Sequence, residues 1–323
     1  MLSRVAESVY WMSRYIERAE NVARFVDVNQ HFTLDLPGEP ADQWMPLVAT
    51  TGDDGWFAER YGTPERSNVL RFLLFDREYP NSVASCLRAA RENARGAREV
   101  IASDLFEQLN RAYLMVTEAS KSPNEILNDP GLFLQTVKEA CHALLGTTLV
   151  SMTHNEAWHF MRVGRLLERA DKTSRIVDVK YFLLLPSPAD VGTPADELQW
   201  AALLKSASAF EMYRKRFGRI APMNVVDFLL LDEDFPRACR YCVSLAQRSL
   251  RAIDGDRRNP VARQAGRLSS KLEFVDVEEI IKEGLHQWVD GLQTSLNGLG
   301  QAIGERFFGA EPIPTTSASQ SQA

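Results

Sequence analysis

The chain has 323 residues, of which 45% are hydrophobic, so it is long enough to bury a large core. Its formal net charge of −6 gives no overall positive field of the kind that attracts nucleic acid or an anionic membrane. The N-terminal segment carries charges from its first residues and has no apolar run of the length that a signal peptide or a membrane span needs. We therefore expect a cytoplasmic protein whose partners include neither nucleic acid nor a membrane.

Apolar residues recur at steps of three and four from the start of the chain, and few stretches alternate with a period of two. The first segment shows this pattern as one apolar stripe, formed by Val5, Val9, Met12, Ile16, Ala19, Ala23 and Val26. Clusters of proline and glycine interrupt the pattern at 36–40, 122–131 and 186–194. The sequence therefore predicts an all-α fold.

Two segments of the chain occur twice, in the same order. Residues 15–28 (YIERAENVARFVDV) match 166–179 (LLERADKTSRIVDV), and 68–80 (NVLRFLLFDREYP) match 224–236 (NVVDFLLLDEDFP). We interpret the chain as a tandem duplication of a helical-bundle unit, residues 1–147 and 148–308, packed closely about a pseudo-two-fold axis. Residues 309–323 are expected to form a disordered tail. The sequence leaves open whether the units form one intertwined bundle or two.

Charged residues recur at equivalent positions of the duplicated helix. One polar arc beside the apolar stripe holds Glu17, Glu20, Arg24 and Asp27, and its second copy holds Glu168, Asp171, Arg175 and Asp178. These charges could form interior ion pairs that fix helix packing, a ligand-binding site, or an ordinary solvated face.

Arg18 falls outside this arc, on an aromatic-rich side of the same helix. A guanidinium there must extend to solvent or meet a carboxylate from another helix, because unpaired burial of a charge is very costly. If the duplication places the two helices about a two-fold axis, the acid for Arg18 is Glu168 or Asp171. By the same argument Arg169 needs Glu17 or Glu20. We therefore predict a buried polar cluster at the junction of the units that also contains Arg24 and Arg175.

Asp76 and Asp232 recur where one predicted helix ends and the next begins, four residues before Pro80 and Pro236. Helix capping is the leading interpretation of a carboxylate at such a position. A catalytic or metal role is the alternative.

Three Glu-x-x-His pairs suggest a metal centre: Glu139 with His142, Glu156 with His159, and Glu283 with His286. Two such pairs and two further glutamates, for which Glu17 and Glu168 are available, would form a di-iron or di-manganese bundle site. Acidic residues are common here and give such pairs by chance, so we predict no bound metal and no cofactor. Cys239-Arg-Tyr-Cys242 lacks the second CxxC of a zinc site, and no nucleotide-binding glycine loop occurs.

The segments Glu17-Arg18-Ala19-Glu20 and Glu168-Arg169-Ala170-Asp171 resemble the signature of the Alpha-E family, bacterial helical proteins with a Glu-Arg pair. The resemblance covers nearly the whole chain and includes the short segments Leu2-Ser3-Arg4, Tyr10-Trp11, Asn155-Glu156-Ala157-Trp158 and Gly164-Arg165, as well as Arg175 and Asp178.

The resemblance implies an accessory or scaffold protein, encoded beside circularly permuted ATP-grasp ligase-like proteins and transglutaminase-like proteins. Its expected role is in peptide (amide-bond) synthesis or modification. The alternative is an enzyme with a polar centre around the Glu-Arg helices that could hold a divalent metal. The sequence leaves open whether the chain is an enzyme at all.

Overall fold

The computed structural model describes residues 1–35, 40–183, 193–255 and 259–309, and the expected disordered tail lies outside these ranges from residue 310 onward. The fold is all-α, as predicted. The described residues contain no strand, and their helices are α1 (Ser3–Asp35), α2 (Pro40–Ala49), α3 (Asp54–Tyr61), α4 (Arg66–Phe75), α5 (Val83–Gly96), α6 (Ser103–Ala119), α7 (Pro123–Asn128), α8 (Gly131–Ser151), α9 (Glu156–Leu183), α10 (Pro194–Ser206), α11 (Phe210–Phe217), α12 (Pro222–Leu230), α13 (Cys239–Ile253), α14 (Pro260–Phe274), α15 (Val277–Glu283), α16 (Leu285–Ile303) and the short π-helix η2 (Gly304–Phe308).

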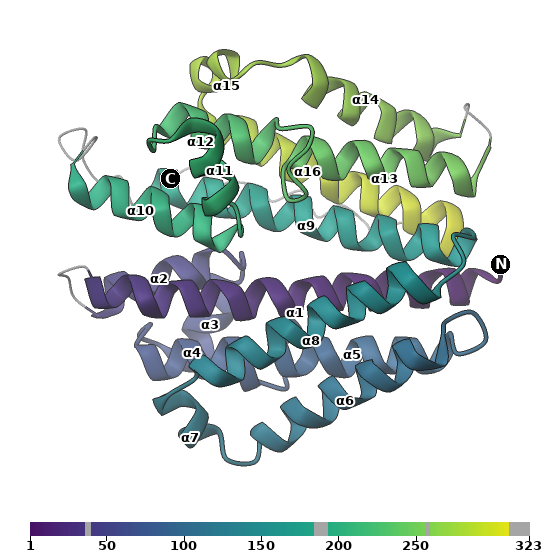
Figure 1. Cartoon of the computed structure of the whole chain (residues 1–323), viewed down its shortest axis with the longest axis horizontal. Coiled ribbons are helices and arrows are strands. Elements are labelled where there is room, and N and C mark those ends of the chain that lie inside the picture. Colours follow the sequence, from purple (N-terminus) through teal and green to yellow (C-terminus); the bar gives the residue numbers. More distant parts are fainter. Residues whose placement is uncertain (36–39, 184–192, 256–258, 310–323) are drawn as a thin grey trace, which may run out of the picture.

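The two longest helices, α1 and α9, lie side by side along the middle of the molecule (Figure 1). On one side α1 packs against α5 and α8, and α6 packs against both of these helices. On the other side α9 packs against α13 and α16, and α14 packs against both of these. The Glu-Arg motifs therefore lie on the two helices that join the halves of the molecule.

The shorter helices connect the halves further. Helix α10 packs against α1 as well as α9, and α2 packs against α9 as well as α1. The helices of the two halves follow one another in the same order along the chain. The boundary expected between 147 and 148 falls inside α8, and the break in the helical chain comes between Ser151 and Glu156. The duplication itself stays a prediction of the sequence.

The apolar stripe of the first segment explains why α1 is central. Six of its members are fully buried, and Ile16 is partly buried. Several other helices begin at side-chain caps, as at Ser82, whose hydroxyl oxygen accepts a hydrogen bond from Ser85 N at 3.1 Å, and at Asp276, which accepts from Glu279 N at 2.8 Å. None of the helices in the described ranges is both long and apolar enough to cross a membrane.

One glycine sets how closely α1 and α9 approach. A Cβ atom added at Gly164 would lie 2.3 Å from the backbone carbonyl oxygen of Tyr10, far inside van der Waals contact. Only glycine leaves room for this backbone approach. The contact comes about one to two turns before the Glu-Arg motif of each helix, so it brings the two motifs within side-chain reach of each other.

Candidate functional site

The two Glu-Arg pairs bind each other across the α1–α9 interface. Arg18 donates from Nε to Glu168 Oε1 at 2.7 Å and from Nη2 to Oε2 at 2.9 Å. Arg169 donates in the same way to the two oxygens of Glu17, at 2.7 and 2.8 Å. Both pairs are bidentate. Glu17, Glu168 and Arg169 are buried, with Glu168 fully inaccessible, and Arg18 is partly buried. The predicted contacts of Arg18 and Arg169 with acids of the opposite helix are therefore confirmed.

The pair around Glu168 is completed by neutral and cationic neighbours. Arg14 Nε donates to Glu168 Oε2 at 2.9 Å, and Arg18 Nη1 donates to the side-chain oxygen of Asn81. Asn81 in turn donates from Nδ2 to Asp53 Oδ2 at 3.1 Å. Glu168, Arg18, Asn81 and Asp53 thus form one continuous series of hydrogen bonds in this half of the interface.

Electrostatics keeps the Glu168 cluster ionised. Burial alone would raise the pKa of Glu168, but Arg18 and Arg14 hold that pKa well below its usual range. Burial would lower the pKa of Arg18, but Glu168 raises it instead. The opposite charges therefore outweigh desolvation here, which is the condition for a stable buried ion pair.

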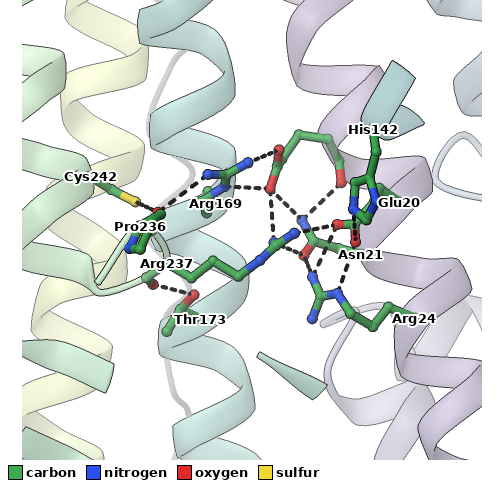
Figure 2. Close-up of polar contacts among 10 residues, drawn as sticks. Glu20, Asn21, Arg24, His142, Arg169, Thr173, Pro236, Arg237 and Cys242 are labelled. Carbon is green, nitrogen blue, oxygen red and sulfur yellow. Dashed lines mark hydrogen bonds and ion pairs between the residues drawn. The ribbon is translucent and has the colours of Figure 1, made fainter. Parts of the chain in front are cut away.

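A further arginine, Arg237, contacts the pair formed by Glu17 and Arg169 (Figure 2). Arg237, in the turn before α13, donates to Glu17 Oε1 at 3.1 Å and to Glu20 Oε2 at 2.9 Å. Arg24 also donates to Glu20, from Nε at 3.0 Å, and to the side-chain oxygen of Asn21. Two carboxylates, Glu17 and Glu20, are thus shared among three guanidinium groups.

The pKa values reflect this excess of positive charge. Burial would raise the pKa of Glu17 and of Glu20, but their arginine partners lower both. Burial and the neighbouring Arg24 lower the pKa of Arg237 despite its two carboxylate partners. A small cavity of about 40 Å³ adjoins this half of the interface, between α1, α8 and α9, and Glu17, Glu20 and Arg237 all line it.

The other two arginines of the predicted cluster, Arg24 and Arg175, each pair with an acid on their own helix. Arg175 Nε lies 3.0 Å from Asp171 Oδ2, one turn away on α9, just as Arg24 pairs with Glu20 on α1. Glu168, and not Asp171, is the acid that Arg18 reaches. Arg175 is more exposed than Arg24, so it lies at the edge of the predicted cluster.

Asp76 and Asp232 bind the turns that follow their helices. Asp76 Oδ1 accepts from Glu78 N at 2.8 Å and Tyr79 N at 3.1 Å. Asp232 Oδ1 accepts from the equivalent amides of residues 234 and 235 at 2.9 and 2.6 Å. These amides lie in turns and not in a helix, and the N-cap positions of α5 and α13 are Ser82 and Ala238. The two carboxylates therefore fix the turns that carry Asn81 and Arg237 toward the interface, which differs from the predicted helix capping.

The three Glu-x-x-His pairs each meet other partners. His142 Nε2 lies 3.5 Å from Glu20 Oε1, and His286 Nδ1 lies 2.7 Å from Asp178 Oδ1. Glu156 accepts from the α-amino group of Met1 at 2.8 Å. Within the described ranges no three His, Cys, Asp or Glu side chains are grouped so that they could hold a metal ion. Cys239 and Cys242 are buried free thiols, and burial raises the pKa of both.

Sequence reasoning missed four residues of the interface: Arg14, Asn21, Asn81 and Arg237. Two of them had a signal in the sequence, because Asn81 and Arg237 directly follow the prolines that end the second repeated segment. Extending that match by one residue would have identified a position where the two copies differ in charge.

A family model described as a predicted alpha-helical domain with a conserved ER motif, Alpha-E, matches residues 1–308. The chain belongs to the Alpha-E family. The Glu-Arg pairs that bind each other across α1 and α9 have the two residue types that this description names.

Uncharacterised proteins of Mycobacterium bovis and Mycobacterium tuberculosis are 22% identical to the chain over 327 aligned residues. These matches cover 93% of this chain but only 36% of each relative, so the chain spans little more than a third of their length. No solved structure matches the chain significantly.

Proposed function

We propose that this chain is an accessory or scaffold protein that works with a circularly permuted ATP-grasp ligase-like partner in peptide (amide-bond) synthesis or modification. A transglutaminase-like protein is a second proposed partner. The observation that carries the accessory role is the reciprocal binding of the two Glu-Arg pairs, whose carboxylate oxygens each accept an arginine N–H. Charges engaged in this way stabilise a framework and leave little freedom for proton transfer.

The length of the mycobacterial relatives supports the same role. In those proteins the region similar to this chain makes up 36% of the sequence, so it is joined to a much longer remainder. A region that is part of a longer chain in one protein can act in another as a separate chain bound to a partner, and this supports the accessory role.

The proposal is tested with purified proteins. The chain is mixed with a circularly permuted ATP-grasp ligase-like protein of the same organism, the complex is measured by size-exclusion chromatography with light scattering, and the product is identified by mass spectrometry. We expect a stable complex, more ligation product than from the ligase-like protein alone, and no ATP hydrolysis by this chain alone. Absence of both the complex and the effect on product would contradict the proposal.

The alternative, an enzyme with its own polar centre, differs in a property of the isolated chain. An enzyme of this kind turns over a peptide or nucleotide without the partner, and a metal-dependent one carries about two equivalents of iron or manganese. Elemental analysis of the purified chain and assays without the partner separate the two functions. Metal that is lost in His142→Ala, together with activity of the chain alone, would favour the enzyme.

A further inference from the structure

Two arginines of α9 stand out because they lack acidic partners. The Nε atom of Arg165 is buried and has no hydrogen-bond partner among the described residues. Arg162 lies one turn earlier, half-buried, with its guanidinium 5.1 Å from the centre of the Trp158 ring. Neither side chain forms an ion pair with any residue that the structure describes. Both line the same cavity of about 40 Å³.

The equivalent arginine of α1 shows that this situation is unusual. Arg14 precedes Glu17 by three residues, as Arg165 precedes Glu168. Burial would lower the pKa of Arg14, but Tyr10 and Glu168 raise it. Burial and the nearby Arg169 instead lower the pKa of Arg165 to about 10. Arg14 has a carboxylate partner, whereas the one Arg165 would use, Glu17, is taken by Arg169 and Arg237.

The balance of charge around the cavity is strongly positive. Its lining includes four arginines, at 162, 165, 169 and 237, and two carboxylates, Glu17 and Glu20. Both carboxylates are already bound by arginines, and Glu20 is also bound by Arg24. A buried surplus of cations is costly unless an anion offsets it.

We propose that this cavity binds an oxyanion, the carboxylate or phosphate group of a small ligand, through the guanidinium groups of Arg162 and Arg165. The planar fork of arginine donors matches both groups, and positions three residues apart on a helix lie on one face. Trp158, Met161 and Leu145 form an apolar part of the cavity wall, and the small volume suits the anionic group itself. Exposed His142 lies at the cavity on α8.

The test uses the full chain and two probes, inorganic phosphate and N-acetylglycine, the latter as a model of a peptide C-terminus. Each probe is titrated at constant ionic strength maintained with sodium chloride, and binding is followed by calorimetry and by the melting temperature. We expect at least one probe to bind saturably and to raise the melting temperature. Saturation by phosphate alone indicates a phosphorylated ligand, and saturation by N-acetylglycine alone indicates a carboxylate ligand.

The variants Arg165→Gln and Arg162→Gln are each expected to weaken binding at least tenfold. The matched control is Arg251→Gln, an exposed arginine of α13, which should bind as the original chain does. Arg162 is half-exposed, so its variant keeps the test valid if Arg165→Gln fails to fold. Absence of saturable binding by either probe, or unchanged affinity in both variants, overturns the proposal. The site does not depend on the proposed partner, so failure here leaves complex formation with the ligase-like protein intact.

Discussion

The two halves of the α1–α9 interface use the same Glu-Arg pair but complete it differently. Around Glu168, the further contact of Arg18 is the neutral amide of Asn81. Around Glu17, the residue at the corresponding place after the repeated Asp-x-x-x-Pro segment is Arg237, which binds Glu17 directly. A change from amide to guanidinium at one position thus alters the charge balance of an otherwise repeated arrangement.

This difference separates the arginines that stabilise the fold from an arginine that is free to bind a ligand. In the Glu168 half, Arg14 and Arg18 share the carboxylate. In the Glu17 half, Arg237 takes the place that Arg14 has in the other half, and Arg165 has no acid left. The repeated residues therefore account for stability, and the departure from the repeat marks the candidate binding site.

The largest expected effect follows from removing the carboxylate that Arg14 and Arg18 share. Glu168→Gln leaves the partly buried Arg14 and Arg18 without their anionic partner, and breaking a buried pair costs up to about 3 to 5 kcal/mol. Urea denaturation measures the loss of unfolding free energy. Glu92→Gln, which removes the two surface ion pairs of Glu92 with Arg91 and Arg95 on α5, is the control and should change stability by less than about 0.5 kcal/mol. A loss of similar size in both variants would show that the Glu168 pairs are not structural.

A smaller loss is expected from widening the interface itself. The methyl group of Gly164→Ala would lie 2.3 Å from Tyr10 O, so α1 and α9 must separate. Overpacking of this kind costs about 1 to 3 kcal/mol. Gly146→Ala on α8 is the control, because its added Cβ meets nothing within 4 Å and should stabilise by about 0.5 to 1 kcal/mol. Thermal unfolding of both variants distinguishes a close helix contact from a general effect of alanine on helices.

The fold class and the contacts of Arg18 and Arg169 could be predicted because they depend on local periodicity and on the cost of an unpaired charge. Arg18 lies on an aromatic side of its helix, and only a carboxylate from another helix satisfies it there. The choice of Glu168 over Asp171 could not be predicted, because it depends on the register that Gly164 sets. Arg237 was missed because it lies in a turn, where helical periodicity gives no information.

A comparison of Arg14→Gln with Arg165→Gln sharpens the difference between the halves. Arg14→Gln removes a hydrogen bond to a buried carboxylate, which costs about 1.5 to 3 kcal/mol. Arg165→Gln removes a buried charge without a partner, so it should leave stability unchanged or increase it. Chemical denaturation without added phosphate or carboxylate measures both. Equal losses of unfolding free energy in the two variants would mean that Arg14 and Arg165 are equally well paired in the folded chain.

The smallest effect is expected in the dependence of stability on pH. Arg18 and Arg14 outweigh burial and hold the pKa of folded Glu168 below the value of about 4.3 that a glutamate has in an unfolded chain. The unfolded state then binds more protons than the folded state between these two pKa values, so stability rises with pH across that interval. The contribution of Glu168 is therefore fully present above about pH 4.3 and is lost as pH falls through the folded pKa.

We expect the unfolding free energy to fall below about pH 4.3, since Glu17 and Glu20 also have lowered pKa values. In Glu168→Gln the fall at acid pH should be shallower, because one of the titrating groups is gone. Urea denaturation across this pH range gives the slopes. An unchanged slope in Glu168→Gln would mean that the arginines do not lower its pKa in the folded state, and the two halves would then differ in more than Asn81 and Arg237.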